Sequence, residues 1–212
     1  MVFCMIKILE LERFESLGDN CEFGFFERVC GREVGSLLRW AITPPDALVN
    51  GLRSRFSGLY DFDYLTPHTD GMVRDTRSGF IFHSQLLSKN KEFIQNEQKR
   101  REIHRVEWEK INYLSNKLIE SMSLKKIFVY KRKERIPEST AKDIADAIAS
   151  LGPSTLLVVT DLGEMDFGQV KHVSDNLYIG RIDKFAPYHQ ADDLSVTIWT
   201  SIVQNAAVAI SS

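Results

Sequence analysis

Two residues of this sequence, Cys21 and His83, are of types and in places that support nucleophilic chemistry. Cys21 follows the polar turn at 16–20 (SLGDN) and opens a segment that predicts a helix ending at Gly31. The free amides and the dipole at a helix N-terminus favour a thiolate, which is the reactive form of cysteine. His83 ends a predicted strand, where an imidazole can act as the general base for a thiol. The two residues therefore predict thiol-dependent acyl chemistry, with the helix-start amides stabilising an oxyanion.

Both residues also have a purely structural interpretation. A cysteine is often a small buried hydrophobe, and a single histidine is more often structural than catalytic. The other two cysteines, Cys4 and Cys30, lie among apolar residues and are assigned to packing. Three cysteines at irregular spacing do not indicate a disulfide framework, and the absence of a CxxC pair argues against structural zinc.

A third catalytic residue would orient the imidazole, and two aspartates are candidates. Asp161 follows the apolar run at 155–159, at the position of an orienting acid at a strand end, and Asp75 is its rival. Either aspartate could instead be a turn residue or a cap. We take Asp161 as the predicted third catalytic residue and leave the alternative open.

Four polar residues are predicted to bind substrate. Asn20 lies beside the thiol, and Arg39, Arg100 and Arg101 have guanidinium groups that can grip a phosphate or carboxylate with two hydrogen bonds. The alternative for the basic run at 99–101 is a solvated helix face, which is the usual meaning of a charge run.

The overall charge excludes several classes of partner and cofactor. The chain has 27 basic and 29 acidic residues, so no nucleic-acid partner is expected. There is no glycine-rich phosphate loop and no pair of ligands at metal spacing, so we expect no cofactor and no metal. The N-terminus lacks the pattern of a signal peptide, and no uncharged run approaches the ~20 residues that span a bilayer. We expect a cytoplasmic protein.

The pattern of apolar residues predicts an α/β fold with a mixed or mainly parallel sheet flanked by helices. Its 212 residues, 43% of them hydrophobic, suffice for one domain over 1–212, with a site-bearing part at about 14–122 and a βαβ part at about 123–212. Strands are predicted at 36–42, 72–75, 79–83, 127–130, 155–159 and 176–180, and helices at 21–30, 44–56, 89–122, 137–151 and 193–209. The helix at 89–122 is long and highly charged, and it offers a surface for a homodimer.

Residues 14–132 resemble a bacterial family described as papain-like cysteine peptidases, in which the peptidase activity is itself a prediction. The resemblance rests on SLGDNCEFG, the aromatic stretch after Phe56, GFIFH ending at His83, and KRR at 99–101, in this order. It implies a pair of Cys21 and His83. Genes of the family often lie beside those for glycosyltransferases and surface polysaccharides, which implies a role in surface-polysaccharide metabolism.

The sequence departs from this family at one position. Many members have Pro-Phe-Asp-Trp where this chain has Leu-Leu-Arg-Trp at 37–40, so Arg39 replaces an acid. A different resemblance, to hydrolases that begin with Gly-Asp-Ser, fails because Asn20 stands at the serine position and no Asp-x-x-His pair occurs near His189.

These observations predict a papain-like hydrolase or acyltransferase that acts on a small-molecule, peptide or glycan-linked substrate. The alternative is a non-catalytic ligand-binding or accessory protein of glycan assembly that uses the same cleft for recognition.

Overall fold

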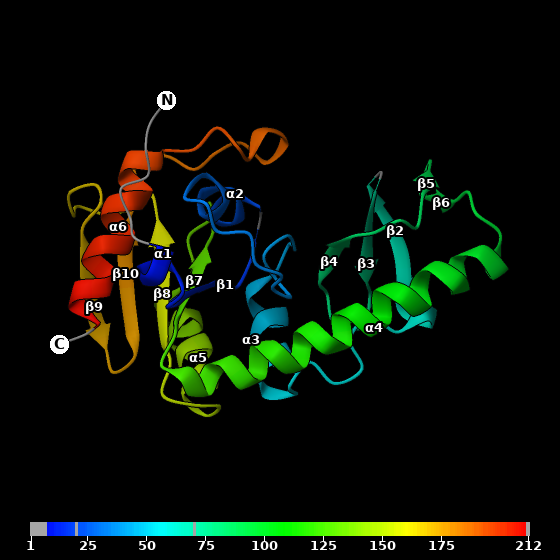
Figure 1. Cartoon of the computed structure of the whole chain (residues 1–212), viewed down its shortest axis with the longest axis horizontal. Helices are drawn as coiled ribbons and strands as arrows, with labels where there is room; N and C mark the ends of the chain where they lie inside the picture. Colours follow the sequence, from blue (N-terminus) through cyan, green and yellow to red (C-terminus); the bar gives the residue numbers. More distant parts are fainter. Residues whose placement is uncertain (1–7, 20, 70, 211–212) are drawn as a thin grey trace.

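The protein is described by a computed structural model, which covers residues 8–19, 21–69 and 71–210. Its centre is a five-stranded sheet in the order β1-β7-β8-β10-β9. β1, β7, β8 and β10 are parallel, and β9 pairs antiparallel with β10. Their bounds are Phe14–Ser16 for β1, Ile127–Lys131 for β7, Thr155–Thr160 for β8, Val170–Ser174 for β9 and Leu177–Arg181 for β10. The predicted α/β class with a mainly parallel sheet is confirmed (Figure 1).

Helices cover both faces of this sheet. Successive residues of a strand point to opposite faces, and in β7 and β8 the residues that point to each face are apolar. One face packs against α2 and α6 in a core that contains Phe23, Val129 and Trp199. The other face packs against α3 and α5 in a core that contains Phe128, Ile144 and Leu156. The helices are α1 (Ile8–Leu11), α2 (Glu22–Val29), α3 (Pro45–Arg53), α4 (Glu97–Ser121), α5 (Glu138–Ala149) and α6 (Val196–Ala209).

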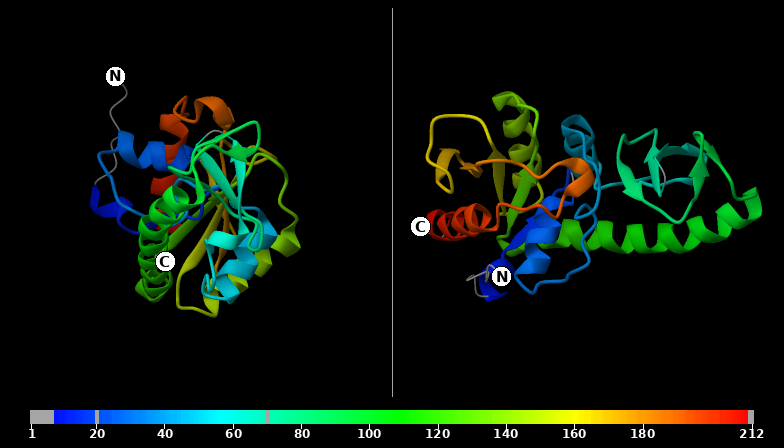
Figure 2. Two further views of the ribbon diagram at one scale, coloured as in Figure 1. Left: turned by 90° about the vertical axis from the view of Figure 1, so that its right-hand side faces the viewer. Right: turned by 90° about the horizontal axis from the view of Figure 1, so that it is seen from above.

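A second, antiparallel sheet lies beside the first and carries His83. It has the order β2-β3-β4, with β2 at Leu65–Thr69, β3 at Met72–Asp75 and β4 at Ile81–His83. A small hairpin of β5 (Ser88–Lys89) and β6 (Glu92–Phe93) follows. Figures 1 and 2 show this sheet extending away from the main sheet, with α4 running along both.

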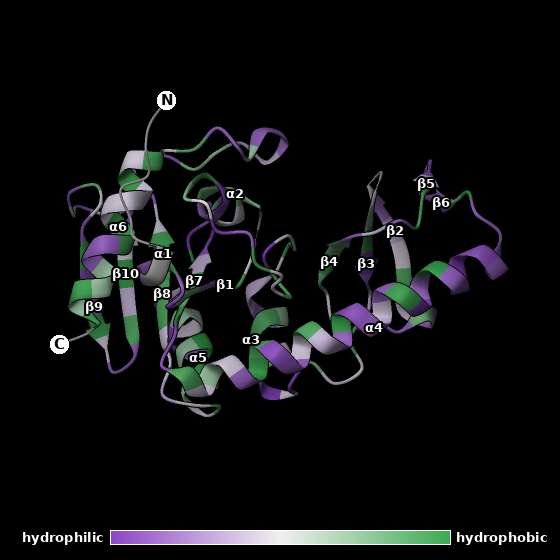
Figure 3. Cartoon of the chain, in the orientation of Figure 1, coloured by the Kyte–Doolittle hydropathy of each residue, from purple (hydrophilic) through white to green (hydrophobic). Residues whose placement is uncertain are grey.

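The long helix α4 changes character along its length. It spans 25 residues, and its buried residues lie in its second half: Ile111, Leu114, Ser115, Leu118 and Ser121. In Figure 3 the first turns of α4 are mainly hydrophilic. The buried strand β8, by contrast, is mainly hydrophobic in the same view. The helix begins after Asn96, whose side chain accepts a hydrogen bond from the Lys99 amide, so the predicted start at 89 is too early.

Three further segments differ from the sequence prediction. Residues 36–42 form bends and turns with one isolated bridge from Ile42 to Ile81, instead of a strand. β2 and β9 were not predicted. β2 contains Pro67, which argues against a central strand, and β9 (VKHVS) contains charged and half-exposed residues. Within the described residues, no helix is both long and apolar enough to cross a membrane.

Candidate functional site

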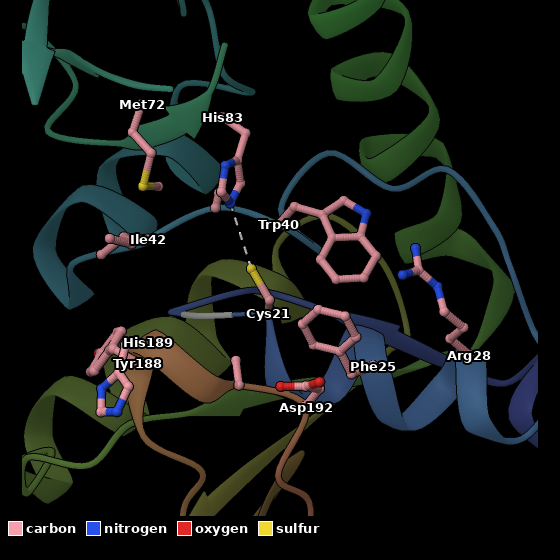
Figure 4. Close-up of a pocket in the computed structure, with 12 residues that line it drawn as sticks. Cys21, Phe25, Arg28, Trp40, Ile42, Met72, His83, Tyr188, His189 and Asp192 are labelled. Carbon is pink, nitrogen blue, oxygen red and sulfur yellow. Dashed lines mark hydrogen bonds between the residues drawn. The ribbon is translucent and has the colours of Figure 1, made fainter. Parts of the chain in front are cut away.

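The thiol of Cys21 and the imidazole of His83 face each other. Cys21 Sγ lies 3.7 Å from His83 Nε2, within the hydrogen-bonding range of sulfur (Figure 4). The two residues are separated by 62 positions and come from different sheets, since Cys21 lies just beyond β1 and His83 ends β4. Cys21 is half-buried and His83 is exposed. The site therefore contains a shielded sulfur beside a solvent-accessible base.

A tight turn after β1 positions Cys21 at the start of α2. Gly18 has φ of +86°, and a Cβ at this position would lie 2.7 Å from the Leu38 carbonyl oxygen. Asp19 also has a positive φ, of 81°. Thr43 closes the turn from the other side, because its hydroxyl donates to the Leu17 carbonyl. The turn thus needs glycine for both conformation and space. Cys21 occupies the N-cap position, and its carbonyl accepts the Phe25 amide.

His83 is held by backbone pairing within the second sheet. It lies opposite Met72 in the β3–β4 register, and the next residue, Ser84, donates its amide to the Gly71 carbonyl. The same strand is joined to the segment that follows the Cys21 turn, because Ile42 and Ile81 exchange two backbone hydrogen bonds. This bridge fixes the approach of the histidine strand to the thiol.

A cavity of about 580 Å³ opens beside the pair. Figure 4 shows Phe25, Trp40 and Arg28 on one side of Cys21. The Phe25 and Trp40 rings pack edge to face at 5.2 Å, and the Arg28 guanidinium lies 5.0 Å from the centre of the Trp40 ring. The remaining walls are formed by Ala41, Ile42 and Met72 and by the loop residues Tyr188, His189, Ala191 and Asp192.

The loop at 182–195 reaches the cavity from the C-terminal half of the chain. Tyr188 donates its hydroxyl hydrogen to Asp19 Oδ2 at 2.9 Å, and Arg132 pairs with Asp19 Oδ1 at 3.1 Å. Asp19 is fully buried. Burial raises its pKa, while Arg132 and the hydrogen bond from Tyr188 act in the opposite direction. A carboxylate in the Cys21 turn therefore holds both the loop and the end of β7.

Glu22, the residue after Cys21, forms a buried ion pair. Lys131 Nζ is 2.9 Å from Glu22 Oε2, and the other oxygen of Glu22 accepts a hydrogen bond from Trp199 Nε1 at 2.9 Å. Burial raises the pKa of the Cys21 thiol, and the positive charge of Lys131 lessens that rise. Desolvation therefore opposes an isolated thiolate here, and the positive charge of Lys131 acts against this effect of desolvation.

The structure separates the predicted third residues from the Cys21–His83 pair. Asp161 follows β8 and is not among the residues that line the cavity; its Oδ1 is buried and has no hydrogen-bond partner within the described part of the chain. Asp75 accepts the backbone amides of Tyr60, Arg77 and Ser78, which is the structural role of a turn residue. Neither aspartate therefore orients the imidazole of His83 in this structure.

Arg39, predicted to bind substrate, has an internal role. Only 1% of it is exposed, and its guanidinium donates to the carbonyls of Gly24, Arg32 and Val34. It also pairs with Glu27 at 3.1 Å. The basic residue that replaces the acid of the resembling family therefore holds the loop after α2 instead of facing the cavity.

The other predicted binding residues lie elsewhere. Arg100 and Arg101 are in the first turns of α4, where both guanidinium groups lie over the Phe62 ring and Arg101 pairs with Glu97. They do not line the cavity at Cys21. Asn20 falls outside the described residues. Cys4 does too. Cys30 is buried in the core beside α2, as predicted, but it is disulfide-bonded, so its role is not packing alone. Among the described residues, Cys21 is the free cysteine.

Sequence reasoning missed several residues of the site. Lys131 and Arg132 were not predicted as site residues, although the apolar run before them indicated that they stand at a strand end. No sequence signal pairs Tyr188 with Asp19, because 169 positions separate them. In the described part of the chain, no group of three or more histidine, cysteine or acidic side chains could hold a metal ion.

Comparisons with known proteins leave the site to be interpreted from its geometry. No family model, no curated protein and no solved structure matches this chain.

Proposed function

We propose that this protein is a thiol-dependent hydrolase or acyltransferase in which Cys21 is the nucleophile and His83 is the general base. The observation that carries the proposal is the 3.7 Å separation of Cys21 Sγ and His83 Nε2 at the wall of a cavity. Hydrogen bonds between catalytic groups are often long before substrate binds, so this distance is compatible with proton transfer.

The proposed reaction has two stages. His83 Nε2 takes the Cys21 proton as the sulfur attacks a carbonyl carbon, and the carbonyl oxygen becomes negatively charged. The oxyanion is stabilised by helix-start amides of α2. The tetrahedral intermediate then collapses, the leaving group takes the proton from Nε2, and an acyl-thioester remains on Cys21. Water or another acceptor attacks this thioester, gives its proton to His83, and restores the thiol as the acyl product departs.

The environment of the sulfur explains why a base is needed. Burial raises the pKa of the Cys21 thiol, so the thiol alone is largely protonated at neutral pH. Transfer of its proton to His83 creates an ion pair instead of an isolated buried anion, and opposite charges at this separation stabilise each other. In this proposal the Cys21 sulfur becomes nucleophilic when it transfers its proton to His83.

The cavity walls favour a substrate with an apolar or planar group beside the acyl carbon. Phe25, Trp40 and Met72 supply apolar surface, and the Arg28 guanidinium lies at the edge of the aromatic pair. The resemblance to the polysaccharide-associated family extends the proposal to acyl groups carried by glycans.

The direct experiment is acylation by p-nitrophenyl acetate. We expect a burst of p-nitrophenolate equivalent to one site per chain and an acetyl group on Cys21 by mass spectrometry. Cys21→Ser should abolish the burst. His83→Ala should slow it by about a hundredfold at pH 7, the low end of what a general base contributes.

His172→Ala is the matched control. This histidine is exposed on β9, and its Nε2 contacts the Asp175 carbonyl, away from the cavity. The substitution should leave the burst unchanged. Acylation of another residue, or a burst that His83→Ala does not slow, contradicts the proposal.

A second candidate function is recognition without catalysis. It is favoured by the raised pKa of Cys21 and by the Phe25–Trp40 pair, which can serve a binding surface equally well. The two functions differ in whether they require the thiol of Cys21. If Cys21→Ala retains full biological activity, the cavity serves recognition.

A further inference from the structure

A buried ion pair lies beside the proposed nucleophile, and the acyl chemistry described above does not use it. Lys131 is the last residue of β7 and is 2% exposed; Glu22, the first residue of α2, is fully buried. Nζ of Lys131 lies 2.9 Å from Oε2 of Glu22, and Trp199 Nε1 donates to the other oxygen. The carboxylate is thus held from two sides.

The sheet register brings this lysine to the thiol. β1 and β7 are parallel, with Ser16 opposite Val129, and the Leu17 amide donates to the Val129 carbonyl. The carboxyl end of β7 therefore lies against the turn that follows β1. Because Glu22 is the neighbour of Cys21 in sequence, its ion pair anchors the ammonium close to the sulfur.

We propose that Lys131 is an electrostatic positioning residue of this site, whose buried ammonium stabilises the thiolate of Cys21 and is held in place by Glu22. The inference rests on the proposed function, in which the sulfur reacts as a thiolate.

A structural role alone explains the pair poorly. Replacing a buried ion pair with apolar side chains of similar volume is often neutral or stabilising, so such a pair is weak evidence for stability. Its charge acts strongly on nearby groups because little water screens it. Consistently, the positive charge of Lys131 lowers the pKa of the thiol against the effect of burial. Burial lowers the pKa of Lys131 itself, and the charges of Glu22 and Cys21 oppose that change and favour the ammonium.

Several other ionisable groups face this region. His83 faces the sulfur from β4, and Arg28 lies on the cavity wall from α2. The loop at 182–195 brings His189 and Asp192 to the cavity, and its Phe185 ring lies 4.9 Å from the Lys131 ammonium. Asp19, paired with Arg132, also opposes the lowering of the Lys131 pKa by burial. A test must therefore separate the effect of Lys131 from that of His83.

The test is the pH dependence of Cys21 alkylation by iodoacetamide, which needs no substrate. Lys131→Met alone would leave Glu22 buried without its cation, so the main variant is Lys131→Met with Glu22→Gln, which removes both charges and keeps an acceptor for Trp199. Lys131→Arg retains the positive charge. Lys126→Met is the control, since Lys126 precedes the same strand and faces Glu15 at 3.8 Å.

Glu22→Gln alone, which removes the carboxylate and keeps the ammonium, is the reference for the double variant. Relative to this reference, we expect the double variant to shift the alkylation profile upward by about one pH unit, the lower end of the effect of a nearby opposite charge. At pH 7 this is a roughly tenfold slower reaction for a thiol that is mostly protonated. Lys131→Arg should restore most of the rate, and Lys126→Met should match the native protein. Circular dichroism establishes that each variant is folded.

His83→Ala distinguishes failure of this inference from failure of the proposed function. If His83→Ala slows alkylation and the folded double variant reacts as fast as Glu22→Gln, the proposed nucleophile and base stand and the role of Lys131 is overturned. If neither slows it, both proposals fall. A double variant that does not fold, together with Lys131→Arg that folds but loses the native profile, also overturns the inference, because the charge alone should suffice.

Discussion

Tyr188 donates its hydroxyl hydrogen to Oδ2 of Asp19, two residues before Cys21, and so joins a loop of the C-terminal half to the turn that presents the thiol. The acceptor is fully buried and also pairs with Arg132. One carboxylate therefore orders the turn, the end of β7 and the loop at 182–195.

Removal of this hydroxyl should loosen the loop. Tyr188→Phe leaves one oxygen of Asp19 without its donor, and we expect a loss of about 1 kcal/mol in the free energy of unfolding. Urea denaturation measures this loss, and hydrogen exchange should become faster in residues 183–195. Tyr113→Phe, at an exposed position on α4, is the control and should change neither. Unchanged exchange in the loop would mean that the hydrogen bond does not hold it.

Gly18 should tolerate no side chain. With φ of +86° and a Cβ 2.7 Å from the Leu38 oxygen, Gly18→Ala must both strain the backbone and move the chain. We expect a cost above the about 1–2 kcal/mol of a left-handed non-glycine residue, and slower alkylation of Cys21.

Gly71→Ala isolates the backbone cost, because Gly71 has φ of +74° and its added methyl group would meet no atom within 4 Å. The difference between the two variants in urea denaturation measures the steric contribution at the turn. Equal losses would show that the turn adapts to the methyl group.

Arg39 should matter for stability and not for anion binding. Arg39→Ala removes the donors of three carbonyls and one of the two arginines that pair with Glu27, and we expect a loss of about 3–5 kcal/mol. Arg53→Ala is the control: Arg53 and Asp143 form an ion pair in which both side chains are 55% exposed, worth about 0–1 kcal/mol. Thermal and urea denaturation compare the two variants, and a loss below about 1 kcal/mol for Arg39→Ala would contradict its structural role.

Glu27 should give the protein a pH-dependent stability. Burial, opposed by Arg32 and Arg39, raises the pKa of Glu27 to about 7. In this case the folded state holds a proton that the unfolded state releases above its ordinary pKa of 4.5. Stability from this group is therefore complete below pH 4.5 and is lost as the pH rises towards 7.

Between pH 4.5 and pH 7, the contribution of Glu27 to the free energy of unfolding should fall by about 3 kcal/mol. Glu27→Gln does not titrate, so the difference in the free energy of unfolding between the native protein and this variant should follow that direction. Urea denaturation at a series of pH values measures it. A difference that is constant, or that grows in favour of the native protein with rising pH, would refute the assignment.

The fold was predictable where burial alone decides the element. TLLVVT at β8 and IFVYK at β7 are continuous apolar or amphipathic runs that any buried parallel strand requires, and the helix between them has a clear apolar face. The prediction of a strand at 36–42 was wrong. The apolar residues around Arg39 resemble a strand in sequence, but in the structure this segment forms bends and turns. The polar strand β9 is specified by pairing with β10, which no local pattern records.

The candidate site was predictable only in its most reactive members. Cys21 and His83 stood out because a thiol after a glycine turn and a histidine at a strand end have local signatures. The groups around Cys21 and His83 have no such local signature in the sequence. Lys131 meets Glu22 across 109 positions. Asp161 was attractive because it follows a strand, but that strand, β8, is separated from β1 by β7. Proximity of this kind is set by strand order and becomes visible only in three dimensions.

The hydrogen bond from Trp199 to Glu22 spans 177 positions of the chain. Contacts this remote close slowly, because the intervening chain must be ordered before they form. During synthesis, the turn with Cys21 leaves the ribosome long before the strand and helix that complete its surroundings. We therefore expect the thiol to acquire its final environment only late in biogenesis, when α6 docks, so the nascent protein spends most of its translation without an assembled centre.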